Sequence, residues 1–240
     1  MIAVGGDGHA AAVARGLIGG RTPMAILPAG SANDLARTLA LPTKDIRKAI
    51  DAALTGRIQR IDTMRVTTAN GERHFLNVVG TGFDAEVAAA AEGITVMRGA
   101  GRYVMAILRV LPRFAATTLR LTIDGERRTE RAMMIAIANG PAYGGGMKLA
   151  PAARLDSGQL EICIVGEVSK PEFLRAFPRV FRGTHVDHPQ VTMLTGHRIE
   201  IDAERPLDLM GDGERVGRLP ASIEVHPQSL SIVTLAVSRT

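Results

Sequence analysis

Two short loops near the start of the chain contain the residue types that bind phosphate. Gly5-Gly6-Asp7-Gly8 follows the apolar run 2–4, and Pro28-Ala29-Gly30-Ser31-Ala32-Asn33-Asp34 follows a second apolar run at 24–27. Glycine has no Cβ, so the backbone of such a loop can approach a phosphate closely. The helix expected after each loop adds free N–H groups and the positive end of its dipole. One such loop could be a structural turn, but two in succession predict a nucleotide-phosphate site.

These loops are expected to join the strands and helices of an α/β lobe that spans residues 1–56. Ser31 and Asp34 fit the S/T-x-x-D/E capping box, which places a helix start near Ala32. Apolar residues then recur at helical spacing up to Leu54, and Gly56 stands where that helix would end. The expected order is strand 2–4, helix 10–17, strand 24–27, helix 32–39 and helix 43–54.

From Arg57 onward the pattern changes to the alternation of a β-rich lobe, which we expect over residues 57–240. Asn70-Gly71 and Asp124-Gly125 predict hairpin turns, and a helix is expected at 104–114. Many strands joined by hairpins, with few helices, indicate a sandwich or barrel-like lobe. The expected strands cover 58–66, 74–78, 119–123, 133–138, 160–165, 197–202, 222–225 and 230–237.

The composition favours nucleotide phosphates or an anionic membrane surface as partners. The net charge is +5, and the chain has no Trp and two Tyr, so nucleic-acid binding is not expected. No apolar run is long enough to span a membrane and no signal peptide opens the chain, which favours a cytoplasmic protein. The single cysteine, Cys163, is interpreted as a buried thiol. His185 and His188 lack a third ligand at suitable spacing and are interpreted as surface loop.

The two loops together resemble those of the diacylglycerol-kinase-like lipid kinases, whose bacterial members carry GGDGT and PxGTxNDFAR. The likeness continues through Asn139, Gly144-Gly145-Gly146, residues 151–160 and Asp212-Gly213-Glu214. It implies a Rossmann-like nucleotide lobe followed by a β-sandwich lobe. Family members carry a further strand and helix before GGDG, so the first lobe is expected to be incomplete at its N-terminal side. NAD kinases share GGDG but lack the second loop, which therefore favours a lipid kinase.

The resemblance implies roles for the residues of both loops. Gly5, Gly6 and Gly8 would let the first loop fold under the phosphates of ATP. Asp7 would hold Mg²⁺ or cap the following helix. His9 replaces a threonine that is typical of the family, and it would either donate a hydrogen bond to a phosphate or lie exposed at the start of the helix. The second loop supplies Gly30 and Ser31, which would contact the nucleotide, and Asn33 and Asp34, which would hold the two loops together.

The resemblance also assigns acids in the second lobe, with Glu214 and Asp212 as the catalytic residues. Asp212-Gly213-Glu214 matches a DGE segment whose glutamate acts as general base toward the lipid hydroxyl, although DGE alone is a commonplace hairpin turn. Asp156 matches an aspartate that holds a structural Mg²⁺ in some bacterial members. Ser157 replaces a second aspartate there, which favours a plain turn over a metal site.

The sequence thus predicts a lipid kinase that uses ATP and Mg²⁺ to phosphorylate diacylglycerol or a related lipid alcohol. It would act as a peripheral protein at the anionic inner surface of the membrane, and a homodimer is left open. Two alternatives also stay open. One is an NAD kinase, and the other is a lipid or nucleotide binder without activity, which His9, Ser157 and the shortened first lobe favour.

Overall fold

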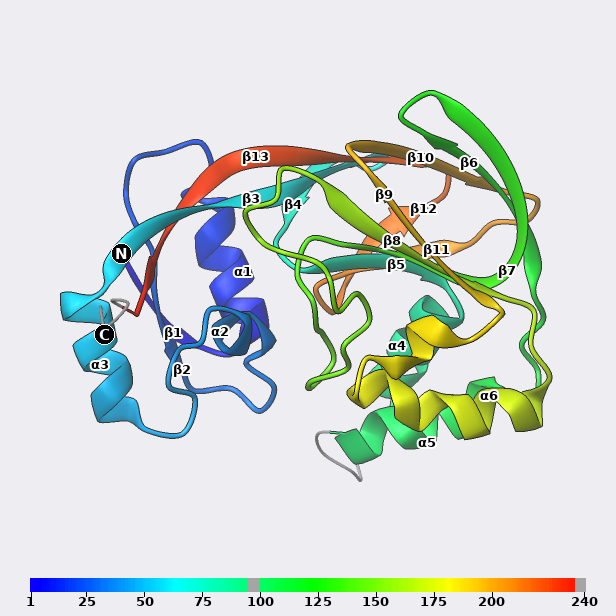
Figure 1. Ribbon diagram of the computed structural model, residues 1–240, viewed down its shortest axis with the longest axis horizontal. Coiled ribbons are helices and arrows are strands. Elements are labelled where there is room, and N and C mark those ends of the chain that lie inside the picture. Colours follow the sequence, from blue (N-terminus) through cyan, green and yellow to red (C-terminus); the bar gives the residue numbers. More distant parts are fainter. Residues whose placement is uncertain (95–99, 236–240) are drawn as a thin grey trace.

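A computed structural model of the protein describes residues 1–94 and 100–235 and divides into two lobes (Figure 1). The smaller lobe, at the left of Figure 1, is α/β, and the larger lobe is a curved β-sheet with helices below it. The expected fold class, an α/β lobe followed by a β-rich lobe, is confirmed. The smaller lobe contains β1 (Ile2–Gly5), α1 (Asp7–Arg15), β2 (Ala25–Pro28), α2 (Asp34–Thr38) and α3 (Ile46–Thr55).

The larger lobe is built on one 11-stranded sheet whose paired strands are antiparallel. Its strands are β3 (Arg57–Thr68), β4 (Gly71–Phe75), β5 (Val78–Gly82), β6 (Thr117–Ile123), β7 (Glu126–Ala138), β8 (Leu160–Gly166), β9 (Val191–Gly196), β10 (Arg198–Ala203), β11 (Asp208–Gly211), β12 (Glu214–Arg218) and β13 (Ala221–Thr234). Their order in the sheet is β12-β11-β5-β7-β6-β10-β13-β3-β4, and β8 pairs with β7 and β9.

Helices cover one face of this sheet and create a second apolar core. One core, which includes Phe75 and Leu121, lies within the curved sheet, and another, which includes Phe83 and Ile107, lies between the sheet and the helices. The helix expected at 104–114 begins and ends four residues earlier. The helices over 83–92 and 170–176 were not predicted. The helical elements are α4 (Phe83–Glu92), α5 (Ala100–Val110), α6 (Lys170–Ala176) and the short 3-10 helices η1 (Phe177–Phe181) and η2 (Thr184–Asp187).

Strands β3 and β13 run along both lobes and complete the smaller one (Figure 1). The Met24 N–H donates to the Ser231 carbonyl at 2.9 Å, and the Val233 N–H donates to the Met24 carbonyl at 2.8 Å. The side chains of Ile61 and Ile232 belong to the apolar core of the smaller lobe. The division at residue 57 stays a prediction, and the packed lobes share these two strands.

The capping box expected at Ser31 is wrong. Helix α2 begins at Asp34 and has Asn33, not Ser31, as its N-cap. The Asp34 carboxylate does not turn back on its own helix, because it accepts a hydrogen bond from the Gly145 N–H at 2.7 Å. A contact between distant parts of the chain therefore overrides the local motif.

Helix α3 begins at Ile46 rather than near residue 43, because the Asp45 carboxylate accepts hydrogen bonds from the first turn of this helix. Cys163 is buried as expected, and burial raises the pKa of its thiol to about 12. Over residues 1–94 and 100–235, no helix has the length and apolar character needed to cross a membrane. The last residues of the strand expected at 230–237 lie outside the described chain.

Candidate active site

The two loops predicted to bind phosphate lie in direct contact. The Ala29 N–H donates to the Gly5 carbonyl at 3.0 Å. A Cβ built on Gly6 would lie 3.1 Å from the Cα of Gly30, and a Cβ built on Gly30 would overlap the Cα of Gly6. Any side chain at Gly30 would therefore force the loops apart. The structure brings together the two turns that are far apart in the sequence.

Polar side chains hold the loops in this arrangement. Asn33 adopts the left-handed conformation with φ 54°. Its side chain accepts a hydrogen bond from the Gly30 N–H at 3.0 Å and donates one to the Gly30 carbonyl at 2.7 Å, so these bonds brace the second loop itself and do not join the two loops as expected. Asp7 accepts a hydrogen bond from the Leu35 N–H at 3.0 Å, so the first loop is tied to the first turn of α2.

A third glycine-rich loop, Gly144-Gly145-Gly146, reaches the same place from the larger lobe. The Gly145 N–H donates to one oxygen of Asp34, and the other oxygen, Oδ1, is buried and has no hydrogen-bond partner among the described residues. Burial raises the pKa of Asp34, and the bond from Gly145 opposes that rise only in part. A buried acceptor left unpaired in this way is suited to bind a ligand.

Asp212 belongs to the turn between β11 and β12 and fixes it against the sheet. With Asp212 at φ 47° and Gly213 at φ 82°, the turn has the left-handed backbone of a tight hairpin. The Asp212 carboxylate accepts hydrogen bonds from the N–H groups of Leu76, Asn77 and Val78 at 2.6 to 3.0 Å. Burial raises the pKa of Asp212 even though these three bonds act in the opposite direction.

Glu214 forms an ion pair that crosses between the lobes. Its carboxylate accepts hydrogen bonds from Arg15 of α1 at 3.1 Å and from Arg73 of β4 at 2.5 Å. Partial burial raises the pKa of Glu214, but the bonds and charges of the two arginines outweigh burial and hold the pKa below its usual range. Glu214 is thus an ionised carboxylate with two cationic partners.

A cavity of about 560 Å³ opens where the three loops meet. Its lining includes four aspartates, Asp7, Asp34, Asp84 and Asp212, together with Ser31. The other predicted loop residues, Gly5, Gly6, Gly8, Gly30 and Asn33, shape the loops behind this surface. Glu214 is not among the described residues that line the cavity.

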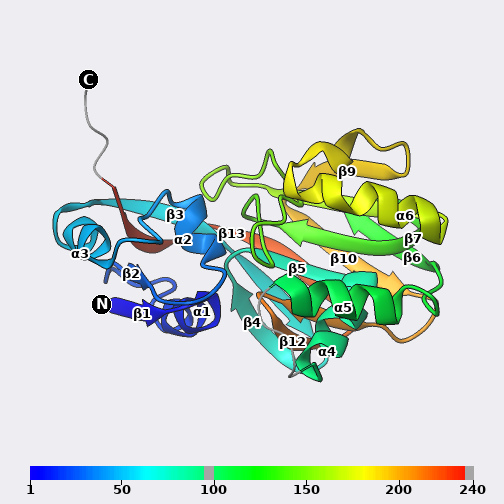
Figure 2. The ribbon, with the colours of Figure 1, turned by 90° about the horizontal axis from the view of Figure 1, so that it is seen from below.

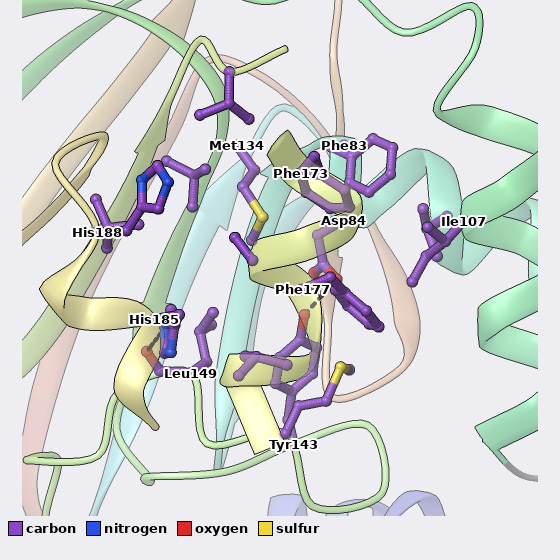
Figure 3. Close-up of a pocket in the computed structure, with 17 residues that line it drawn as sticks. Phe83, Asp84, Ile107, Met134, Tyr143, Leu149, Phe173, Phe177, His185 and His188 are labelled. Atoms are coloured by element: carbon purple, nitrogen blue, oxygen red, sulfur yellow. Dashed lines mark hydrogen bonds between the residues drawn. The ribbon is translucent and has the colours of Figure 1, made fainter. Parts of the chain in front are cut away.

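A second, apolar pocket of about 100 Å³ adjoins this cavity (Figure 3). Asp84 and Tyr143 line both spaces. The Tyr143 hydroxyl donates a hydrogen bond to Asp84 at 2.5 Å, and the two side chains point toward each other in Figure 3. Burial raises the pKa of Asp84, while the bond from Tyr143 partly opposes that rise. A polar pair therefore stands at the junction of the loop-lined cavity and an apolar pocket.

Two predicted residues lie apart from this junction. His9 is exposed and is not one of the described lining residues. Asp156 accepts hydrogen bonds from Arg154 at 3.3 Å and from Gln59 at 3.2 Å. A guanidinium beside Asp156 does not fit a cation site, and the described residues contain no group of three or more metal-ligating side chains.

The interpretation of His185 and His188 as surface loop is wrong. His185 is buried, with its Nε2 at 3.1 Å from the Leu149 carbonyl oxygen, and both histidines line the apolar pocket (Figure 3). Burial lowers the pKa of His185, so its ring is favoured in the neutral form. The rings lie inside because η2, which carries His185 and ends next to His188, packs beside the edge strand β9.

Asp84 and the two arginines that bind Glu214 were not predicted from the sequence. Asp84 stands in the first turn of α4, two residues after Gly80-Thr81-Gly82, the run of small residues that ends β5. A run of small residues after an apolar strand also marks the first two loops, so the same pattern could have identified Asp84. Arg15 and Arg73 have no comparable signal, because only the packing of α1 beside β4 brings them to Glu214.

Comparisons with known proteins agree with this architecture. Residues 1–66 match the diacylglycerol kinase catalytic domain, and residues 77–234 match the YegS C-terminal NAD kinase beta sandwich-like domain. The chain is 32% identical over 235 residues to a diacylglycerol kinase of Mycobacterium tuberculosis (strain ATCC 25618 / H37Rv), covering 97% of this chain and 76% of the relative. It is 30% identical over 223 residues to a diacylglycerol kinase of Bacillus subtilis (strain 168), covering 92% and 72%.

The solved structures give the same result. A candidate diacylglycerol kinase from Bacillus anthracis str. Sterne superposes with a TM-score of 0.78 at 25% identity, covering 97% of this chain and 77% of the other. An α/β lobe followed by a β-sandwich lobe is the architecture that the chain shares with these proteins. The chain belongs to the diacylglycerol kinase family.

Proposed function

We propose that the protein transfers the γ-phosphate of ATP to the hydroxyl group of diacylglycerol or a related lipid alcohol, at the anionic inner surface of the membrane. The relatives named diacylglycerol kinase support the reaction class. The observation that carries the proposal is the junction at Asp84 and Tyr143, where the loop-lined cavity adjoins an apolar pocket. A phosphate donor on one side and a lipid on the other would meet there, and holding two reactants in contact is much of what phosphoryl transfer requires.

ATP would bind with its phosphates against the touching loops. Helix α1 begins directly behind the first loop, and no side chain of the described residues caps its N-terminus. Its first N–H groups are therefore available to a phosphate. Ser31 adds a hydroxyl group, and Asp7 and Asp34 add carboxylate oxygens, the ligands that Mg²⁺ prefers. Mg²⁺ bound with ATP would neutralise the charge on the phosphates.

The lipid would place its apolar part in the pocket of Figure 3. Phe83, Met134 and Phe173 contribute to an apolar lining suited to a hydrocarbon chain. Asp84 and Tyr143 would bind the hydroxyl or ester groups of the lipid at the junction. The raised pKa of Asp84 favours the neutral carboxyl, which can donate as well as accept a hydrogen bond.

We retain Glu214 as the proposed general base. To accept the proton of the lipid hydroxyl, its carboxylate has to exchange one arginine partner for the substrate. Arg15 belongs to the smaller lobe and Arg73 to the larger lobe, so the ion pairs of Glu214 depend on the relative orientation of the two lobes. Hydrogen bonds of catalytic groups often form only in the substrate complex. Asp212, which binds three backbone N–H groups, is assigned the positioning of the turn.

The test is transfer of γ-labelled phosphate from ATP, in the presence of Mg²⁺, to diacylglycerol, a sphingoid base and NAD in separate reactions. We expect labelled lipid phosphate and no labelled NADP. Label in NADP alone would make the protein an NAD kinase. Binding of ATP without transfer to any acceptor would favour a binder without activity, and either result would overturn the proposal.

A further inference from the structure

The apolar pocket lies between two helical segments of the larger lobe. Ile107 of α5 lines one side, and Phe173 of α6 and Phe177 of η1 line the other. Figure 2, the view from below, shows α5 and α6 in front of the sheet, with strands of the sheet visible between the two helices. The Lys170 ammonium donates a hydrogen bond to the Pro112 carbonyl, so the end of α5 is joined to the start of α6.

Both segments expose large apolar side chains around this pocket. Within α5, Ala106 and Ile107 are buried, whereas Val104, Met105 and Leu108 turn outward. Gathered apolar groups on a soluble surface usually mark a site that is covered by a partner. The exposed fractions are 44% for Val104, 46% for Met105, 56% for Leu108, 45% for Leu174 of α6 and 41% for Phe181 of η1.

A run of aromatic rings leads from the interior to this surface. Five of the 6 phenylalanines of the chain take part. The ring centroids of consecutive members lie 4.9 to 6.0 Å apart. The order is Phe114, Phe83, Phe173, Phe177 and Phe181, and only the last of these is exposed. The apolar lining of the pocket is thus continuous with the exposed apolar surface.

The same two segments are strongly basic. Residues 104–113 and 170–182 contain a single acidic residue, Glu172, against six basic ones. All six basic side chains are exposed, and none forms an ion pair with a carboxylate within the described part of the chain. They are Arg109, Arg113, Lys170, Arg175, Arg179 and Arg182.

We propose that residues 104–113 and 170–182, here called the α5–α6 face, dock on an anionic lipid bilayer, and that the pocket between them takes an acyl chain directly from that bilayer. Exposed apolar side chains enter the boundary between headgroups and acyl chains, and unpaired arginines bind the anionic headgroups. Charge complementarity and the continuity of the apolar lining select this occupant. The inference rests on the proposed lipid kinase function and adds the surface through which the lipid arrives.

A second exposed apolar stripe provides a matched control. Ile46, Ile50 and Leu54 lie outward along α3, and Leu54 is 74% exposed. On this helix Arg47 and Lys48 are balanced by Asp51 and by Asp45 at the N-cap, so the stripe lacks the excess of basic side chains found on the α5–α6 face. It also belongs to the smaller lobe, whereas all residues that line the apolar pocket belong to the larger one.

Docking is measured without ATP by sedimentation of the protein with vesicles of phosphatidylglycerol and phosphatidylcholine, and with vesicles of phosphatidylcholine alone. The wild type should bind only the anionic vesicles strongly. Leu108→Asp should weaken binding at least about tenfold, since it removes an inserted leucine and adds a repelled charge. Arg179→Gln should weaken binding about fivefold. Leu54→Asp and Arg47→Gln, on the smaller lobe, should bind as the wild type does.

Three results would overturn the docking surface: equal vesicle binding by Leu108→Asp and the wild type, loss of binding in Leu54→Asp instead, or a dimer of the wild type that Leu108→Asp converts to monomer. Melting temperatures near that of the wild type establish that each variant is folded. Phosphorylation of a short-chain, water-soluble diacylglycerol separates the two proposals. Leu108→Asp should retain that activity, because Leu108 does not line the pocket. Anionic vesicle binding without phosphorylation of any lipid would refute the kinase but not the docking surface.

Discussion

Gly6 and Gly30 are packed so closely that the Cα of Gly6 occupies the space that a Cβ on Gly30 would need. The contact joins two loops that are separated by α1 and β2 in the chain. Their shared surface forms part of the cavity to which we assign the phosphates of ATP. Mutations at this contact therefore test the nucleotide site without touching the lipid pocket.

Gly30→Ala should separate the two loops. We expect a loss of stability of about 1–3 kcal/mol from the forced overlap, and at least about tenfold weaker binding of ATP because a misplaced phosphate loop loses its N–H contacts. Titration calorimetry with ATP and thermal melting measure both effects. Gly93→Ala is the matched control, since an added Cβ there would lie 3.8 Å from its nearest neighbour. Unchanged ATP affinity in Gly30→Ala would remove the loop contact from nucleotide binding.

Tyr143→Phe should affect the lipid rather than the nucleotide. The substitution removes the hydroxyl that donates to Asp84 at the junction of the two spaces. A buried acceptor that loses its donor costs about 1–3 kcal/mol of stability. Because the lipid would also lose the Tyr143 hydroxyl and a fixed Asp84 as partners, we expect the KM for lipid to rise about tenfold. The Kd for ATP is the internal control and should stay constant. A rise in the Kd for ATP with an unchanged KM for lipid would contradict the assignment.

Asp84 should give stability a specific dependence on pH. Burial raises its pKa in the folded protein from the usual value of 3.8, so the folded protein binds this proton more tightly than the unfolded chain does. The stabilisation is complete below the usual pKa and is lost as the pH rises through the raised pKa. Asn cannot ionise. The melting temperature of Asp84→Asn, relative to that of the wild type, should therefore increase between about pH 3.5 and pH 7.

Asp34 and Asp212 have pKa values shifted in the same direction. They are present in the wild type and in Asp84→Asn alike, so their contributions cancel in this comparison. The exposed Asp51→Asn variant controls for loss of a carboxylate as such. If the melting temperatures of Asp84→Asn and of the wild type change equally across this pH range, folding does not raise the pKa of Asp84.

Glu214→Gln tests the proposed base. Loss of a general base should lower kcat about 10²–10⁴-fold with little change in the Kd for ATP. Because the arginines hold the pKa of Glu214 below its usual value of 4.5, the wild-type rate should fall only when the pH drops below about 4.5. Glu224→Gln is the matched control, since Glu224 forms a similar ion pair with Arg65 at 2.6 Å on β13 and β3. Near-normal kcat in Glu214→Gln would exclude Glu214 as the base.

Local patterns predicted the parts of this fold that local chemistry determines. The turns at Asn70-Gly71, Asp124-Gly125 and Asp212-Gly213 join antiparallel strands, and in the last two both residues have positive φ. The small-residue loops after β1 and β2 also lie where the sequence placed them. In each case the backbone requirement and the residue that meets it are neighbours in the chain.

Those local patterns did not predict contacts between residues that are distant in the sequence. The bond between Asp34 and Gly145 replaced the expected capping box, and no spacing rule connects these residues. Helix α4 was missed because its alanines at 88–91 give little contrast between a buried and an exposed face. The Asp84–Tyr143 pair and the Arg15–Glu214 pair likewise arise only from packing of the larger lobe against loops and helices.

The backbone bonds between Met24 and residues 231 and 233 set an order for biosynthesis. When the ribosome has completed β1, α1 and β2, the strand that must lie beside Met24 has not yet been translated. One side of the sheet in the smaller lobe therefore stays unpaired until β13 has been synthesised. A truncation before β13 should leave this lobe unable to fold even though its own residues are intact, and co-translational proteolysis should cleave it until the final strand arrives.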